Sequence, residues 1–154
     1  TKNKWNEELL DMSKFLIDKG VDFKLSNNEG NDALMIASEI GLKELVKLLL
    51  EKGVDVKRKN NNGKTSLMFA SASNSQETVQ LLIEKGARIN SVNNEGYNAL
   101  MYAIETGNYE IVKFLLEKGA DINSQTLEGV TPLKVAKLNG FDEIEKLLLE
   151  KGAK

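Results

Sequence analysis

Hydrophobic and polar positions along the chain follow a pattern that returns every 33 residues. Its most regular mark is a glycine that follows a lysine and an apolar run, at Gly20, Gly53, Gly86, Gly119 and Gly152. A second series of glycines has the same spacing, at Gly30, Gly63, Gly96 and Gly129. A fixed period of this length is typical of a small structural unit stacked along a line. We therefore predict a linear array instead of one globular core.

The segment after each glycine of the second series predicts a short helix. Leucine and alanine recur three residues apart, as Leu34 and Ala37 in the first copy, and so mark one apolar helix face. The residue before each helix is a good N-cap, namely Asp32, Thr65, Asn98 and Thr131. Each helix should end where a left-handed residue closes it, at Gly41, Asn74, Gly107 and Gly140.

A second helix is predicted over the apolar run that leads to the first series of glycines. Glu44 and its equivalents fall in the first turn and Lys52 and its equivalents in the last turn, which suits the helix dipole. This helix is apolar on most sides, so neighbouring units must cover it. The connecting segments end in Asn-Asn-Glu-Gly tips, which is turn chemistry. The alternation at Val54–Val56 and Ala87–Ile89 predicts brief strands.

These features together resemble the ankyrin repeat family. The closest matches are TPLKVA at residues 131–136 and GADIN at residues 119–123, and the resemblance extends over residues 13–154. It implies an all-α solenoid of stacked antiparallel helix pairs with projecting β-hairpins. It also implies protein recognition through the hairpin tips and the inner helix face. The histidine that the family carries after Thr-Pro-Leu is replaced here by Met35, Met68, Met101 and Lys134. We expect the methionines to fill an apolar seam between repeats.

The repeat period divides one ankyrin repeat domain, residues 1–154, into five units. The expected units are a partial N-terminal repeat at 1–26, full repeats at 27–59, 60–92 and 93–125, and a C-terminal capping repeat at 126–154. In the last unit Lys134, Lys137 and Glu145 replace residues that are mostly apolar in the other copies, which predicts a polar outer face.

The N-terminal unit keeps only the second helix of the pattern. Met12, Phe15, Leu16 and Ile17 are in register with the apolar residues of the later copies. The first helix of this unit is either missing or reduced to a turn around Trp5. Such a unit is either naturally short or preceded by residues that are not present.

Composition excludes several kinds of chemistry. The chain contains no cysteine and no histidine, so disulfides, thiolate catalysis and histidine-based metal or acid–base sites are excluded. We therefore expect no catalytic residue, no metal ligand and no cofactor. The net charge is −2 and only Arg58 and Arg88 are arginines, which argues against nucleic-acid binding. No apolar run is long enough to span a membrane, and we expect a cytoplasmic protein, or one inside a host cell if it is a secreted effector.

The expected partner-binding positions lie on the hairpin tips and at the exposed end of each first helix. An apolar cluster on adjacent hairpins is the candidate hot spot, made of Tyr97, Leu127, Val130 and Val92. The alternative is that Leu127 and Val130 only pack one hairpin against another. Further candidates are Lys59, Lys64, Asn61, Glu95, Glu105, Ile40 and Leu138. The basic run formed by Lys57, Arg58, Lys59 and Lys64 either meets an acidic partner or is a solvated turn.

The function expected from this pattern is a non-catalytic module, a monomer, that binds a protein partner. Alternatives are an engineered or consensus-like scaffold and a targeting module of a larger enzyme or effector. Catalysis by the chain itself and nucleic-acid binding through the basic tip are further alternatives. Nucleic-acid binding would collapse with added salt, whereas a partner anchored by Tyr97 would show a weaker salt dependence.

Overall fold

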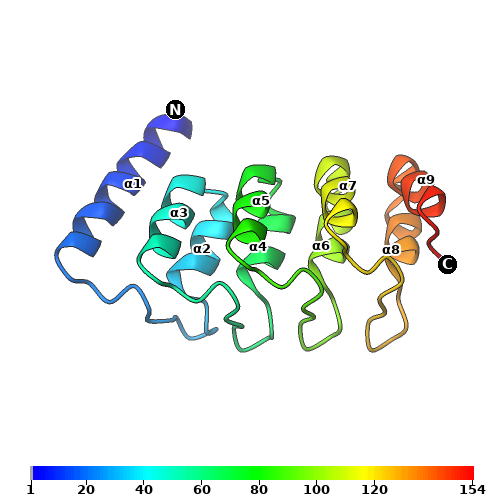
Figure 1. Ribbon diagram of the computed structural model, residues 1–154, viewed down its shortest axis with the longest axis horizontal. Coiled ribbons are helices and arrows are strands. Elements are labelled where there is room, and N and C mark those ends of the chain that lie inside the picture. The colour runs from blue at the N-terminus through cyan, green and yellow to red at the C-terminus, as the bar shows by residue number, and fades with distance from the viewer. Residues whose placement is uncertain (1) are drawn as a thin grey trace.

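The computed structural model describes residues 2–154, and within that range it contains nine α-helices. Helix α1 (Lys2–Asp18) is followed by helix pairs that stand side by side along the long axis (Figure 1). The pairs are α2 (Ala33–Ile40) with α3 (Lys43–Glu51), α4 (Ser66–Ala72) with α5 (Gln76–Glu84), α6 (Ala99–Glu105) with α7 (Tyr109–Glu117), and α8 (Pro132–Asn139) with α9 (Asp142–Glu150). The predicted all-α solenoid is confirmed.

The first helices begin with the side-chain caps that the sequence predicts. Asp32 Oδ1 accepts a hydrogen bond from the Met35 N–H at 2.9 Å, and Asn98 Oδ1 accepts one from the Met101 N–H at 3.0 Å. Thr65 and Thr131 cap α4 and α8 in the same way. After α4 the chain turns through Asn74 at φ 58°, the left-handed conformation that glycine adopts in the other copies. The lysine after each second helix is the C-cap residue itself, one position beyond the last turn.

The core runs along the array between the helix pairs. Leu34, Leu67 and Leu100 are buried, and Met35, Met68 and Met101 are at most 1% exposed, so the predicted methionine seam is confirmed. The first helices of neighbouring pairs pack more closely together than the second helices do. The array therefore curves toward α2, α4, α6 and α8, and its concave face is built from these helices. None of the helices described is long and apolar enough to cross a membrane.

The brief strands predicted at Val54–Val56 and Ala87–Ile89 are absent, and that prediction was wrong. Asp55 Oδ1 accepts a hydrogen bond from the Lys57 N–H at 2.9 Å, and the Arg58 N–H reaches the Asp55 carbonyl at 3.2 Å. A short acidic side chain that binds the backbone in this way stabilises a turn at the expense of a strand. In the described part of the chain, the hairpins contain only isolated bridges at Ser26–Asp32 and Val92–Asn98.

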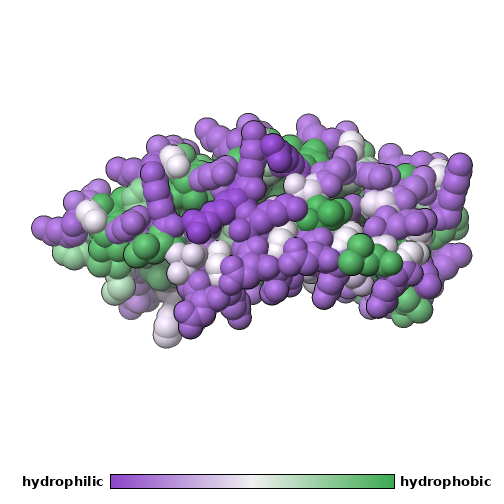
Figure 2. Space-filling view, turned by 90° about the horizontal axis from the view of Figure 1, so that it is seen from below, coloured by the Kyte–Doolittle hydropathy of each residue, from purple (hydrophilic) through white to green (hydrophobic). Residues whose placement is uncertain are grey.

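The N-terminal unit consists of one continuous helix. Trp5 lies inside α1, so of the two alternatives the first helix is missing from the described residues, and the separate turn around Trp5 was wrong. Leu16 is 42% exposed, whereas Leu49, its equivalent in the next unit, is 1% exposed. The difference arises because α1 packs against α3 without a first-type helix beside it in the described residues. Met12 and Phe15 are exposed for the same reason, and Figure 2 shows a broad hydrophobic area at this end.

The outer face of the last helix pair is polar, as predicted. Glu145 stands where Val46, Val79 and Val112 are completely buried in the other pairs. Lys137 Nζ lies 3.6 Å from Glu145 Oε1, so the two charged replacements form an ion pair with each other.

Candidate partner-binding surface

The tips that project below the helices in Figure 1 are short turns held by one side chain each. In the third tip (residues 93–97), Asn93 Oδ1 accepts hydrogen bonds from the N–H groups of Glu95 at 3.0 Å and Tyr97 at 2.8 Å. Asn27 and Asn60 hold the first tip (27–31) and the second tip (60–64) in the same way. Thr126 replaces the asparagine in the fourth tip (126–130), where its hydroxyl accepts from the Val130 N–H. The tips are therefore fixed before any partner arrives.

Neighbouring tips are joined into one ridge by backbone hydrogen bonds. The Asn61 N–H donates to the Glu29 carbonyl, the Asn94 N–H to the Asn62 carbonyl and the Leu127 N–H to the Glu95 carbonyl, at 2.9–3.0 Å. This approach needs a glycine. A Cβ on Gly96, which has φ 89°, would lie only 2.8 Å from Thr126 Cα. The ridge therefore depends on the first three glycines of the second series, Gly30, Gly63 and Gly96.

Two residues of the predicted basic run, Arg58 and Lys59, are engaged between repeats, while Lys57 is exposed. Arg58 Nη1 donates to the Lys24 carbonyl at 2.9 Å, and its Nε lies 3.9 Å from Asp32 Oδ2. Lys59 Nζ donates to the Val92 carbonyl at 2.6 Å. Asn61 Nδ2 likewise donates to the Asn28 carbonyl of the preceding tip. These side chains connect units of the array, and only part of their polar surface is left for a partner.

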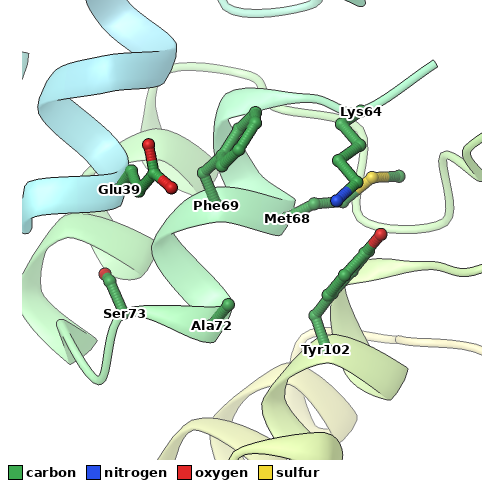
Figure 3. Close-up of a pocket in the computed structure, with 7 residues that line it drawn as sticks. All are labelled: Glu39, Lys64, Met68, Phe69, Ala72, Ser73 and Tyr102. Atoms are coloured by element: carbon green, nitrogen blue, oxygen red, sulfur yellow. The ribbon is translucent and has the colours of Figure 1, made fainter. Parts of the chain in front are cut away.

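A hollow on the concave face holds Lys64, the last lysine of that run (Figure 3). Lys64 Nζ lies 5.1 Å from the ring centre of Tyr102 on α6 and 5.8 Å from that of Phe69 on α4. Glu39 on α2 and Ser73 line the same hollow. An ammonium group at this distance from two rings is held by cation–π attraction. We call this the lysine hollow.

A second hollow lies between the third and fourth tips. It is lined by Glu95, Tyr97, Thr126, Leu127 and Glu128, and we call it the tip hollow. The Leu127 side chain is 82% exposed. The rings of Tyr97 and Tyr102 are 5.8 Å apart, so the tip hollow and the lysine hollow share one aromatic surface.

The electrostatic environment of the tip hollow is negative. Partial burial raises the pKa of Tyr97 above its usual 10.0, and the carboxylates of Glu105, Glu95 and Glu128 raise it further. Loss of water around the carboxyl group raises the pKa of Glu105 above 4.5; Lys64 opposes this effect and Glu95 adds to it. Burial is thus the main cause of both shifts, and the carboxylates of Glu105, Glu95 and Glu128 add to the shift of Tyr97.

The structure brings some of the sequence-predicted residues together and separates others. Tyr97, Leu127 and Glu95 share the tip hollow, while Val130 is partly buried against the core. Val92 is 39% exposed, and the tip hollow does not include it. Ile40 ends α2 and Leu138 lies on α8, with α4 and α6 between these helices. Both side chains are exposed but belong to opposite ends of the concave face.

Sequence reasoning missed the two aromatic residues of the lysine hollow. Phe69 and Tyr102 occupy one repeat position, which is Ile36 in the preceding unit and Val135 in the last. This variation at a fixed position was the available signal. The position lies inside the first helix, away from the tips and helix ends where partner-binding residues were expected.

Over residues 2–154, His, Cys, Asp and Glu side chains form no group of three or more that could hold a metal ion. The sequence matches the family described as ankyrin repeats (3 copies) over residues 4–93, 57–126 and 89–154, which together cover nearly the whole chain. No curated protein is significantly similar to the sequence.

Proposed function

This chain belongs to the ankyrin-repeat family, whose members generally serve as protein-interaction modules, and on that premise we propose that it is a non-catalytic module that binds a protein partner. The binding surface that we propose comprises the third and fourth tips together with the concave helix face beside them. The observation that carries this proposal is the aromatic surface of Phe69, Tyr97 and Tyr102, which is open to solvent at two adjoining hollows.

The rigidity of the ridge supports binding by a preformed surface. Each tip is held by its own asparagine or threonine and is bonded to the next tip through the backbone. A partner therefore pays little conformational entropy for ordering the array, and more of the contact energy appears as affinity. We expect little change of backbone conformation on binding.

The side chains at the hollows are of the kind that dominates binding energies. Tyrosine supplies a large apolar ring with a polar end, and such residues are enriched among binding hot spots. Leu127 presents an aliphatic side chain with 82% exposure directly beside Tyr97. A partner that covers this leucine would remove its apolar side chain from water, which favours binding.

Affinity capture tests the proposal. We would immobilise the protein, pass over it a lysate of its source organism, and compare the wild type with the Tyr97→Ala/Leu127→Ser variant. A matched control is Leu149→Ser, which changes a half-exposed leucine on α9. Circular dichroism verifies that all three proteins are folded. We expect the wild type and the control to capture the same protein in similar amounts. The double variant should capture at least about tenfold less of it, since hot-spot truncations cost about 2 kcal/mol or more. Equal capture by all three would contradict it.

A further inference from the structure

We propose that the tip hollow receives a basic side chain of the partner, arginine in preference to lysine, with an aliphatic residue next to it in the partner's sequence. This inference rests on the proposed function and specifies the chemistry of the partner. The residues that carry it are Tyr97, Glu95, Glu128 and Leu127, which line one open hollow on two adjacent tips.

The two carboxylates that line this hollow, those of Glu95 and Glu128, form no ion pair in the part of the chain that the structure describes. In the described residues, Glu95, Glu105 and Glu128 take part in none of the ion pairs within 4.0 Å, and their carboxylate oxygens accept none of the side-chain hydrogen bonds. Burial is the main cause of the raised pKa of Tyr97, and the carboxylates of Glu105, Glu95 and Glu128 add to it, which agrees with a negative environment. A cationic group entering the hollow would gain attraction from the two carboxylates that line it, Glu95 and Glu128.

The adjacent lysine hollow shows what this aromatic surface holds. There the cation belongs to the chain itself, because Lys64 Nζ lies over Tyr102 and Phe69. One repeat later, the position of Lys64 is taken by Tyr97. The tip hollow thus has the aromatic ring and the carboxylates of such a site, while its cation must come from another molecule.

Arginine fits the hollow better than lysine. Its planar guanidinium group can stack on the Tyr97 ring and donate to carboxylates on both sides, whereas the ammonium group of lysine acts as a point charge. Leu127 stands at the rim, where an aliphatic neighbour of the arginine would cover it. The combination of charge and apolar contact predicts a short basic and aliphatic segment as the ligand.

Peptide selection tests this inference without knowledge of the partner. A displayed library of random dodecapeptides is selected on the immobilised wild-type protein, and the recovered peptides are measured by fluorescence anisotropy. We expect the recovered sequences to be enriched in arginine beside an aliphatic residue. Affinity should fall at least about tenfold for Glu95→Gln/Glu128→Gln, and replacing the arginine of the peptide by lysine should weaken binding while glutamate abolishes it.

The control variant is Glu117→Gln/Glu150→Gln, which removes the same two charges from exposed positions at the ends of α7 and α9. It should bind the selected peptides as the wild type does. The inference is overturned if Glu95→Gln/Glu128→Gln and the control variant lose the same affinity, or if the selected peptides lack basic residues. It is also overturned if no selected peptide depends on Glu95 and Glu128 for binding. Lysate capture that depends on Tyr97 and Leu127 but not on the two glutamates would overturn this inference and leave the proposed function standing.

Discussion

At Asp32, a buried carboxylate caps α2 and faces an arginine of the next repeat. Its Oδ2 has no hydrogen-bond partner, and the nearest charge is Arg58 Nε at 3.9 Å. Two repeats later, Asn98 and Ser124 stand at the positions of Asp32 and Arg58, and Asn98 Nδ2 donates a hydrogen bond to Ser124 Oγ at 2.8 Å. The neutral pair and the charged pair thus occupy equivalent places in the array.

This equivalence gives the first prediction. Arg58→Gln should lower the free energy of unfolding by about 1–3 kcal/mol, because it leaves a buried carboxylate without a counter-charge. The double variant Asp32→Asn/Arg58→Ser copies the Asn98–Ser124 pair and should recover most of that loss. Urea denaturation of the three proteins measures both effects. A double variant that is less stable than Arg58→Gln would show that the ion pair is not the reason.

The glycines of the tips give a second prediction, with a control inside the chain. Gly96→Ala combines a left-handed backbone with a Cβ 2.8 Å from Thr126 Cα, so the third and fourth tips must separate. Gly129→Ala has the same backbone strain at φ 73° but nothing within 4 Å of the added Cβ. We expect Gly129→Ala to cost about 1 kcal/mol and Gly96→Ala to cost more than twice as much by thermal denaturation. Equal costs would mean that the tip contact contributes little.

Glu105 gives a third prediction, on pH. Because its pKa is raised in the folded protein, the native state holds this proton more tightly than the unfolded chain does. The favourable contribution is complete below the unfolded pKa of about 4.5 and is lost as the pH rises through the folded value. At about pH 7, Glu105→Gln should therefore raise the free energy of unfolding by a few tenths of a kcal/mol, since the group is partly solvated, and a slightly higher Tm would show it. The gain should disappear at about pH 4, and a gain that is the same at both pH values would contradict the assignment.

At the scale of elements, each helix pair is stable because its neighbours cover it. Leu82 in α5 is completely buried, and Leu82→Ala should cost about 2–5 kcal/mol. Because stability passes between adjacent units, the loss should also uncouple the pairs on either side. Native-state hydrogen exchange should show faster exchange in α4 and α5, with α8 and α9 less affected. Leu149→Ala, at a half-exposed position, is the control, and a uniform loss of protection in the Leu82→Ala variant would contradict nearest-neighbour coupling.

Helix α1 is the element with the least cover. It packs mainly against α3 and exposes Trp5, Met12 and Phe15, and its Leu16 is 42% exposed where the equivalent Leu49 of α3 is 1% exposed. In the same exchange experiment, α1 should therefore be the least protected of the helices described.

At the scale of the whole molecule, the polar end of the array limits further stacking. Lys137 and Glu145 replace residues that are buried inside the array, where Ile104 and Val112 stand at the same positions of α6 and α7. Lys137→Ile/Glu145→Val would give the last pair the apolar surface of an interior unit. We expect this variant to self-associate, with a sedimentation coefficient that rises with concentration, since a large exposed apolar patch favours association. Lys146→Gln is the control for loss of one charge, and a variant that stays monomeric would argue against the capping role.

The sequence by itself determined the repeat, the helix pairs, their caps and the methionine seam. These features depend on interactions between residues a few positions apart, such as Asp32 with Met35, or on a period that is visible in one dimension. For the same reason the polar end at Lys137 and Glu145 could be predicted without coordinates.

Only the tertiary structure decided how the units meet. A local sequence pattern does not specify the offset between stacked units. That offset decides the hydrogen bonds of Arg58 and Lys59 to neighbouring repeats, the backbone hydrogen bond from Leu127 to Glu95, and the exposure of α1. The strand predicted at Val54–Val56 does not form, because the Asp55 side chain accepts a hydrogen bond from the backbone N–H of Lys57 and stabilises a turn. The convergence of Glu95, Glu105 and Glu128 on Tyr97 likewise required the fold, because their charges act through space and not along the chain.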